Sequence, residues 1–194
     1  SRMKMTPPTT FNPTIANSTT FGGAVFTPDN TVAIGFKVKA LIATTPKEET
    51  FNGSVALSGE FNTNGGMNFI QFDGTFACGA KIGEENKAFA SGGVAVKYDF
   101  INKIFDLKSN LLLDVRSKGI NIYTPSSIYT VLYVNSKTNK WYFKSGTPTT
   151  PMVVNVYGAS TNSYLMFGND LGTDIPTGFM QLTKDGWAQA GLGP

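Results

Sequence analysis

The chain has 194 residues, of which 41% are hydrophobic and only 15% are charged, and its net charge is +3. This length suffices to bury a sizeable core in one large β domain or two small ones. The basic residues are spread along the chain, which excludes a nucleic-acid partner because such a footprint needs clustered basic side chains. Thr, Asn, Gly and Ser supply the polarity instead, a composition typical of extracellular β proteins.

Residues 1–19 contain three prolines and show no hydrophobic periodicity, so we expect an extended arm or linker there. Residues 20–194 are then expected to form a single β domain. The N-terminal segment lacks the apolar run of a signal peptide, and no stretch reaches the ~18 apolar residues of a membrane span. We therefore interpret the chain as a fragment of a larger multidomain protein, with any secretion signal outside it.

Strand-like alternation begins near Phe21 and continues to the C-terminal third. Apolar residues occupy every second position from Val32 to Ala40, which predicts a strand with one apolar face. The pairs Asn52-Gly53 and Asn64-Gly65 tolerate positive φ and mark turns between further short strands.

A β-meander is clearest in the middle of the chain. Val94, Val96 and Tyr98 alternate with polar residues before a turn expected near Asn102-Lys103. A second turn is expected at Ser109-Asn110, followed by a strand in which Leu111, Leu113 and Val115 are the apolar positions. A further strand is expected at residues 128–134, where one face would carry Tyr129, Val131 and Tyr133 and the other Ile128, Leu132 and Val134. The polar turn NSKTN then reverses the chain into a strand that contains residues 141–143.

Helix signals are weak, since no window holds a sustained i, i+3, i+4, i+7 stripe with caps. The sequence therefore predicts an all-β protein, an antiparallel β-sandwich or rolled β-sheet of about ten to fourteen short strands.

The chain contains no histidine, which removes the commonest general base and the commonest transition-metal ligand. Catalysis would have to use paired carboxylates or a Ser-Lys arrangement. Glu84 and Glu85 are adjacent and point to opposite faces of an extended chain, so they cannot flank one glycosidic bond. The single cysteine, Cys78, cannot form an intrachain disulfide and is read as a small buried hydrophobe. We lean against an enzyme, although distant carboxylates can converge in a fold.

The loop GNDLGTDIP offers a candidate metal site. Asn169, Asp170 and Asp174 surround Gly172, and closely spaced oxygen ligands on a glycine-bent loop suit Ca²⁺. The same residues are also ordinary turn formers, and the loop is less acidic than a dedicated Ca²⁺ loop. No other cofactor is expected.

Aromatic residues of the C-terminal half are the second candidate site, with Trp141, Tyr164 and Trp187 as binding residues. Exposed aromatic rings in a row can stack on sugar rings, whereas the alternative is that they close a β core. Trp141 and Tyr142 are neighbours in one strand, so at most one of them can belong to a single platform. Gly146-Thr147-Pro148 is interpreted as the terminator of that strand.

The segment KWYFKSGTPTTPMVVNVYGASTNSYLMFGNDL resembles one that recurs in very long, uncharacterised proteins of Bacteroidota-type bacteria. The matching residues are Lys140, Trp141, Tyr142, Gly146, Thr147, Pro148, Tyr164, Met166, Gly168 and Pro176. The resemblance covers roughly residues 90–180, and the loop after GNDLGTDIP lacks the longer proline run of that pattern. It implies a β-rich module of a large exported or particle-associated protein, and it implies no catalytic residues.

Taken together, these patterns favour a non-catalytic structural or adhesion-like module, located outside the cell or at its surface. Its expected partners are other domains of the same long chain, and a glycan or surface protein. One alternative is a carbohydrate-binding module that uses the C-terminal aromatics. Another is a domain of a secreted effector or toxin delivered by a secretion or contractile injection system.

Overall fold

The computed structural model describes residues 3–6, 19–21, 24–28, 32–117, 119–172 and 187–193, with side chains described for residues 33–116 and 119–172. The predicted all-β, antiparallel fold class is confirmed, because every strand pairing in these residues is antiparallel. Helical structure is limited to short 3-10 segments in the described residues, and one of them is η1 (Glu85–Lys87). No described helix has the length and apolarity to cross a membrane.

Fourteen strands are present in the described residues. They are β1 (Met3–Thr6), β2 (Thr19–Phe21), β3 (Ala24–Pro28), β4 (Val32–Ala43), β5 (Asn52–Asn62), β6 (Met67–Cys78), β7 (Ala90–Asp99), β8 (Ile104–Ser117), β9 (Ile120–Tyr123), β10 (Ile128–Asn135), β11 (Lys140–Ser145), β12 (Met152–Val156), β13 (Ala159–Gly168) and β14 (Trp187–Gly193).

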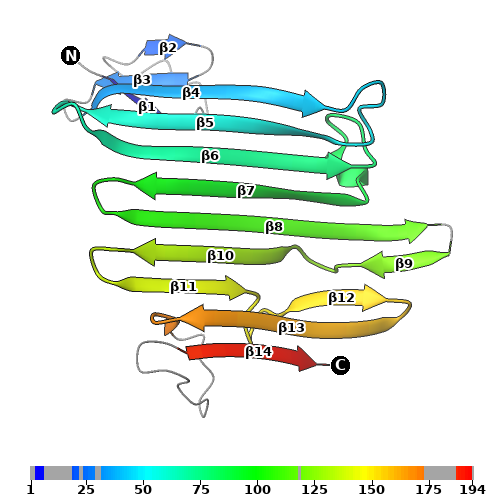
Figure 1. The fold of residues 1–194 in the computed structure, drawn as a ribbon. Helices are drawn as coiled ribbons and strands as arrows, with labels where there is room; N and C mark the ends of the chain where they lie inside the picture. Colours follow the sequence, from blue (N-terminus) through cyan, green and yellow to red (C-terminus); the bar gives the residue numbers. More distant parts are fainter. Residues whose placement is uncertain are drawn as a thin grey trace.

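The eleven strands from β4 to β14 form one continuous open sheet (Figure 1). β4 to β8 follow one another as a meander of long strands. Beyond β8 the short strands β10 and β9 lie end to end along it, and β11 and β12 do the same along β13. β14 pairs with the far side of β13. The sheet therefore has nine rows, two of which are built from two short strands each.

A smaller sheet of order β1-β3-β2 precedes the large one. β1 lies within the segment expected to be an extended arm, and it pairs with β3 in antiparallel register. The boundary between an arm and a single β domain stays a prediction.

β8 corrects one expectation from the sequence. The turn expected near Asn102-Lys103 is present, and Lys103 adopts a left-handed φ of 53° there. The prediction of a second turn at Ser109-Asn110 is wrong, because β8 runs unbroken through both residues. Ser109 lies opposite Val94 of β7 on one side and Thr130 of β10 on the other, so ladders on both sides hold it extended.

The register gives the sheet two faces of opposite character, because residues directly opposite each other share a face and neighbours along a strand do not. The face that we call the apolar face carries Phe36, Val38, Ile42, Val55, Leu57, Ile70, Phe72, Phe76, Val94, Val96, Tyr98, Phe105, Leu107, Leu111, Leu113, Leu132, Val134, Trp141, Phe143, Leu165 and Phe167. The opposite face, the polar face, carries Lys37, Lys39, Ser54, Ser58, Gln71, Asp73, Thr75, Lys97, Asp106, Lys108, Asn110, Tyr129, Tyr133, Tyr142, Lys144 and Tyr164.

A small buried cluster closes the end of the sheet beside η1. Asn52 is only 1% exposed, and its side-chain amide donates to the carbonyls of Ala80 at 2.5 Å and Glu48 at 3.2 Å. Ala77 and Ala80 are buried next to it. A buried amide needs hydrogen-bond partners, so the bond from Asn52 to Ala80 fixes the connection between β6 and β7 over this end of the sheet.

Candidate functional site: the β10–β11 hairpin and the polar-face trough

The hairpin of β10 and β11 separates its aromatic pair onto the two faces, as the alternation predicts. Trp141 lies on the apolar face, with its ring centroid 6.2 Å from that of Phe167. Tyr142 lies on the polar face and stacks on Tyr133, at 5.2 Å between centroids and 17° between planes. Cross-strand aromatic pairs of this kind stabilise a hairpin beyond their burial.

Charged groups surround the stacked tyrosines. The Lys144 ammonium lies 4.6 Å from the centre of the Tyr142 ring. On β8, which neighbours β10, Lys108 and Asp106 form an ion pair of 2.8 Å. Burial, aided by the nearby Asp106 carboxylate, raises the pKa of the Tyr142 phenol. Tyr142 therefore stays neutral at physiological pH and can donate a hydrogen bond.

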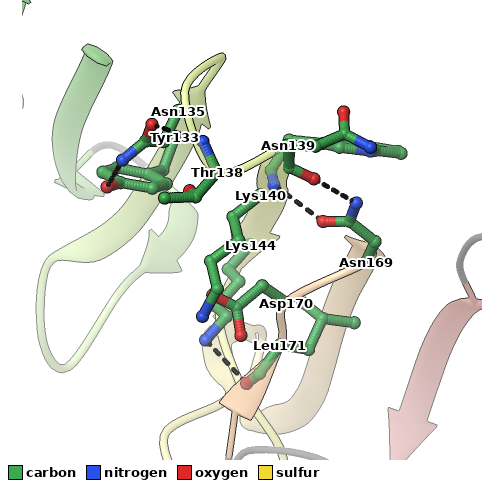
Figure 2. A network of polar contacts seen from close by, with 10 residues as sticks. Tyr133, Asn135, Thr138, Asn139, Lys140, Lys144, Asn169, Asp170 and Leu171 are labelled. Atoms are coloured by element: carbon green, nitrogen blue, oxygen red, sulfur yellow. Dashed lines mark hydrogen bonds and ion pairs between the residues drawn. The ribbon is translucent and has the colours of Figure 1, made fainter. Parts of the chain in front are cut away.

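Asn169 ties the end of β13 to the start of β11 (Figure 2). Its side-chain oxygen accepts from the Trp141 backbone N–H at 2.8 Å, and its side-chain amide donates to the Asn139 carbonyl at 2.6 Å. The Asn169 backbone N–H also donates to the Trp141 carbonyl at 3.0 Å. One residue thus extends the β11–β13 ladder after the β-strand itself has ended.

The neighbouring residues of this loop are engaged in the same way. Asp170 forms a 3.0 Å ion pair with Lys140, and the Leu171 carbonyl accepts from Lys144 at 3.1 Å (Figure 2). Asp174, the third predicted Ca²⁺ ligand, lies outside the described residues. Within the described part of the chain no group of three or more His, Cys, Asp or Glu side chains gathers as a metal site. Calcium binding by this loop stays a prediction.

Gly146 ends β11, as expected for the Gly-Thr-Pro segment. It adopts a φ of 66°, and a Cβ there would lie 2.9 Å from the Met152 backbone nitrogen. The following turn is closed by the Thr147 N–H, which donates to the Thr150 carbonyl at 3.0 Å. Glycine is thus required where the chain leaves β11 for β12.

The three predicted aromatic residues do not form one platform. Trp141 is on the apolar face, whereas Tyr164 of β13 is on the polar face. Trp187 pairs with Gly168 through the backbone of β14, and its side chain lies outside the described part of the structure. Since Trp141 and Tyr164 face opposite ways, they cannot stack on the same sugar chain.

The polar face contains instead a shallow trough that crosses the strands. Three hollows of about 290, 380 and 400 Å³ lie along it. The first and second share Thr75, and the second and third share Tyr129 and Val131, so the hollows adjoin one another. The trough runs from β4 and β5 across β6, β7, β8 and β10 to β11 and the start of β12.

Small residues make the floor of the trough and longer side chains make its walls. Gly93 and Ala95 lie beneath the central hollow, with Asp73, Lys108 and Tyr129 around it. Tyr129 is 66% exposed. The trough therefore offers an aromatic face, a carboxylate and an ammonium group to a ligand lying across the strands.

The trough has no local signature in the sequence. The alternation of Tyr129, Val131 and Tyr133 was visible in the sequence, but their contact with β6 and β7 depends on long-range register. Of the two carboxylates considered for catalysis, Glu84 pairs with Lys87 at 2.9 Å. Glu85 lines the end of the trough beside β4 and β5, and its carboxylate accepts from the Gly83 N–H at 2.9 Å.

Comparison of the chain with family models, with curated proteins and with solved structures found no match.

Proposed function

We propose that this chain is a non-catalytic structural and interaction module of a large exported bacterial protein, exposed outside the cell or at its surface. The observation that carries the proposal is the open sheet itself, with one face almost wholly apolar and the other polar. A sheet of this shape offers two broad surfaces and two edges. β4 forms one edge, since the pairing within the large sheet gives it β5 as its neighbour.

Sheet edges can pair with additional strands, which neighbouring domains of a longer chain could supply. An unpaired edge strand presents a row of backbone donors and acceptors, which further strands can extend. β4 presents Lys37 and Lys39 on the polar face, and charged side chains on an edge limit indiscriminate pairing. Other domains of the same chain are therefore the partners that the edges favour.

The proposal is tested by presenting the 194-residue chain on beads to bacterial cells and to purified extracellular glycans and proteins. Retention of one of these partners, without chemical change in it, is the expected result. A parallel screen for hydrolysis of glycosidic, ester and peptide substrates tests whether the chain is instead an enzyme. Turnover that is abolished by a single Asp→Asn or Glu→Gln substitution would show that the module is an enzyme.

A second candidate function, carbohydrate binding, is favoured by the trough on the polar face. From β5 to β11 the trough crosses five strand spacings, or roughly 24 Å at the usual distance between strands. Its aromatic wall, Tyr129, is exposed, and rings in this position stack on the apolar face of a sugar. An extended oligosaccharide is the ligand class that this length and this lining suit.

Tyr129→Ala tests this second candidate on a glycan array and by calorimetry. Tyr157→Ala is a matched control, because Tyr157 is 65% exposed and lies in the β12–β13 turn, away from the trough. We expect binding to a linear glycan that falls at least tenfold in Tyr129→Ala and stays within twofold in Tyr157→Ala. Equal losses in both variants, or no glycan bound by the parent chain, would remove this candidate.

A further inference from the structure

The apolar face of the sheet lacks cover in the described structure. The buried hydrophobic residues of the described side chains are Ala56, Ala77, Ala80, Met166 and Leu171. Ala56, Ala77 and Met166 lie on the polar face, and the other two lie outside the strands. No described hydrophobic residue of the apolar face is buried.

Large side chains of that face are instead open to solvent. Val38 is 63% exposed, Leu57 42%, Phe72 39% and Leu165 41%, and these residues come from β4, β5, β6 and β13. Exposed side chains thus occur at both β4 and β13, the outermost strands whose side chains on this face are described. A contiguous apolar surface of this extent on a soluble protein marks an interaction surface.

The face is large enough for a stable interface. Eight rows, from β4 to β13, contribute described side chains to it. At the usual strand spacing and rise, eight rows of about ten residues span roughly 34 by 33 Å, or about 1,100 Å². A stable protein interface needs about 800 Å² from each partner.

The face is also flattened, because phenylalanine rings lie over glycines of the neighbouring strands. A Cβ on Gly59 would lie 2.7 Å from the Phe36 ring, and a Cβ on Gly92 would lie 2.9 Å from the Phe76 ring. The rings therefore lie along the sheet and do not stand away from it. A flat face of this kind packs against another flat sheet face, as in a two-layer β structure.

The chemistry of the face makes it self-complementary. The described strand positions of the apolar face from β4 to β13 contain no Asp, Glu, Lys or Arg. Two such faces can meet without like-charge repulsion and without burying an unpaired charge. The polar face, with Lys37, Lys39 and Lys97, does not have this property.

We propose that the apolar face is covered by the same face of a second copy of this chain, in a face-to-face homodimer. The two sheets are related by a two-fold axis and lie about 10 Å apart. This assembly leaves both polar-face troughs outward. The inference does not depend on the proposed module function, since it rests on the apolar face alone.

Sedimentation equilibrium on the whole 194-residue chain tests the proposal with a matched pair of substitutions on β4. Val38→Lys places a charge on the apolar face, and Leu41→Lys places one on the polar face, at residues that are 63% and 65% exposed. We expect a dimeric parent chain, a dissociation constant raised at least tenfold by Val38→Lys, and a change within twofold for Leu41→Lys. Leu57→Lys, one strand further in, is expected to act like Val38→Lys, and far-UV circular dichroism verifies that each variant folds.

Three results would overturn the dimer. A parent chain that stays monomeric at about 100 μM, whether or not its apolar face binds a hydrophobic dye, would do so. So would a monomer that binds phosphatidylcholine vesicles and loses this binding in Val38→Lys, because the face would then belong to lipid. A dimer weakened equally by Val38→Lys and Leu41→Lys would indicate pairing through the β4 edge.

Discussion

Asn169 forms hydrogen bonds with both the backbone N–H and the backbone carbonyl of Trp141. The Asn169 side-chain oxygen accepts from the Trp141 N–H at 2.8 Å, and the Asn169 N–H donates to the Trp141 carbonyl at 3.0 Å. The same side chain donates to Asn139 at 2.6 Å, so one residue anchors the start of β11. The last residues of the segment from Lys140 to Leu171 thus fasten its first residues.

This anchor predicts the effect of removing the side chain. Asn169→Ala is expected to lower the free energy of unfolding by about 1–2 kcal/mol, because two hydrogen bonds are lost and their backbone partners are left unpaired. Asn169→Asp keeps the acceptor for Trp141 but places a carboxylate oxygen against the Asn139 carbonyl, and is expected to lose at least as much at neutral pH. Chemical denaturation measures both variants, and an Asn169→Ala protein as stable as the parent would show that the anchor contributes nothing.

The stacked pair Tyr133 and Tyr142 predicts a coupling between β10 and β11. In a double-mutant cycle with leucine at each position, the interaction energy is expected to be about 0.5–1.5 kcal/mol. Tyr133 with Phe167 serves as the control pair, since these residues lie on opposite faces of the sheet. Denaturant unfolding of the four proteins in each cycle provides the measurement. An additive Tyr133–Tyr142 cycle would argue against the stack.

Gly146 and Gly65 form a matched pair of glycines with positive φ, at 66° and 84°. A Cβ at Gly146 would lie 2.9 Å from the Met152 nitrogen, whereas nothing lies within 4 Å of one at Gly65. Both alanine substitutions add left-handed strain, but only Gly146→Ala adds a backbone clash. We expect Gly146→Ala to destabilise the protein by about 1 kcal/mol more than Gly65→Ala, as measured by thermal and denaturant unfolding. Equal costs would contradict the close approach of β12.

Asp99 predicts how stability changes in acid. Burial acts to raise the pKa of Asp99, but the backbone and side-chain hydrogen bonds from Asn102 outweigh it and hold this pKa below its usual value. A carboxylate with a lowered folded-state pKa stabilises the fold above its unfolded pKa of about 3.9, and this contribution is lost as the pH falls through the folded pKa. The stability difference between the parent chain and Asp99→Asn should therefore shrink between pH 5 and pH 2. A difference that is constant over this range, or an NMR titration midpoint of Asp99 above 3.9, would contradict the assignment.

Much of the local structure follows from sequence alternation. The apolar positions from Ile34 to Ala40, and the split between Trp141 and Tyr142, could be predicted because neighbouring side chains in a strand point to opposite faces. The end of β11 at Gly146 could be predicted from glycine and proline chemistry. The turn at Ser109-Asn110 could not, since polar residues read as a turn locally while two neighbouring ladders hold them extended.

The arrangement of strands in space could not be predicted in the same way. Alternation shows that each strand has an apolar side, but it does not show whether strands join edge to edge in one sheet or face each other in two. The trough beside Tyr129 depends on β10 lying next to β8, and β8 next to β7. β7 and β8 are joined by the predicted turn near Asn102-Lys103, but β9 separates β8 from β10 in the sequence, and local patterns carry no information about the β8–β10 register.

β4 to β14 form one sheet with an apolar and a polar face, and the pairing of β8 with β10 tests this arrangement most directly. NMR of a deuterated sample should give backbone contacts between β8 and β10 that place Ser109 opposite Thr130 and Leu107 opposite Leu132. The same spectra should connect Ser109 to Val94 on the other side of β8. β9 also joins β8 to β12, so the spectra should show Val115 opposite Ile122 as well. Contacts from Ser109 to Val94 without any from β8 to β10 or to β9 would break the sheet into two parts and contradict this arrangement.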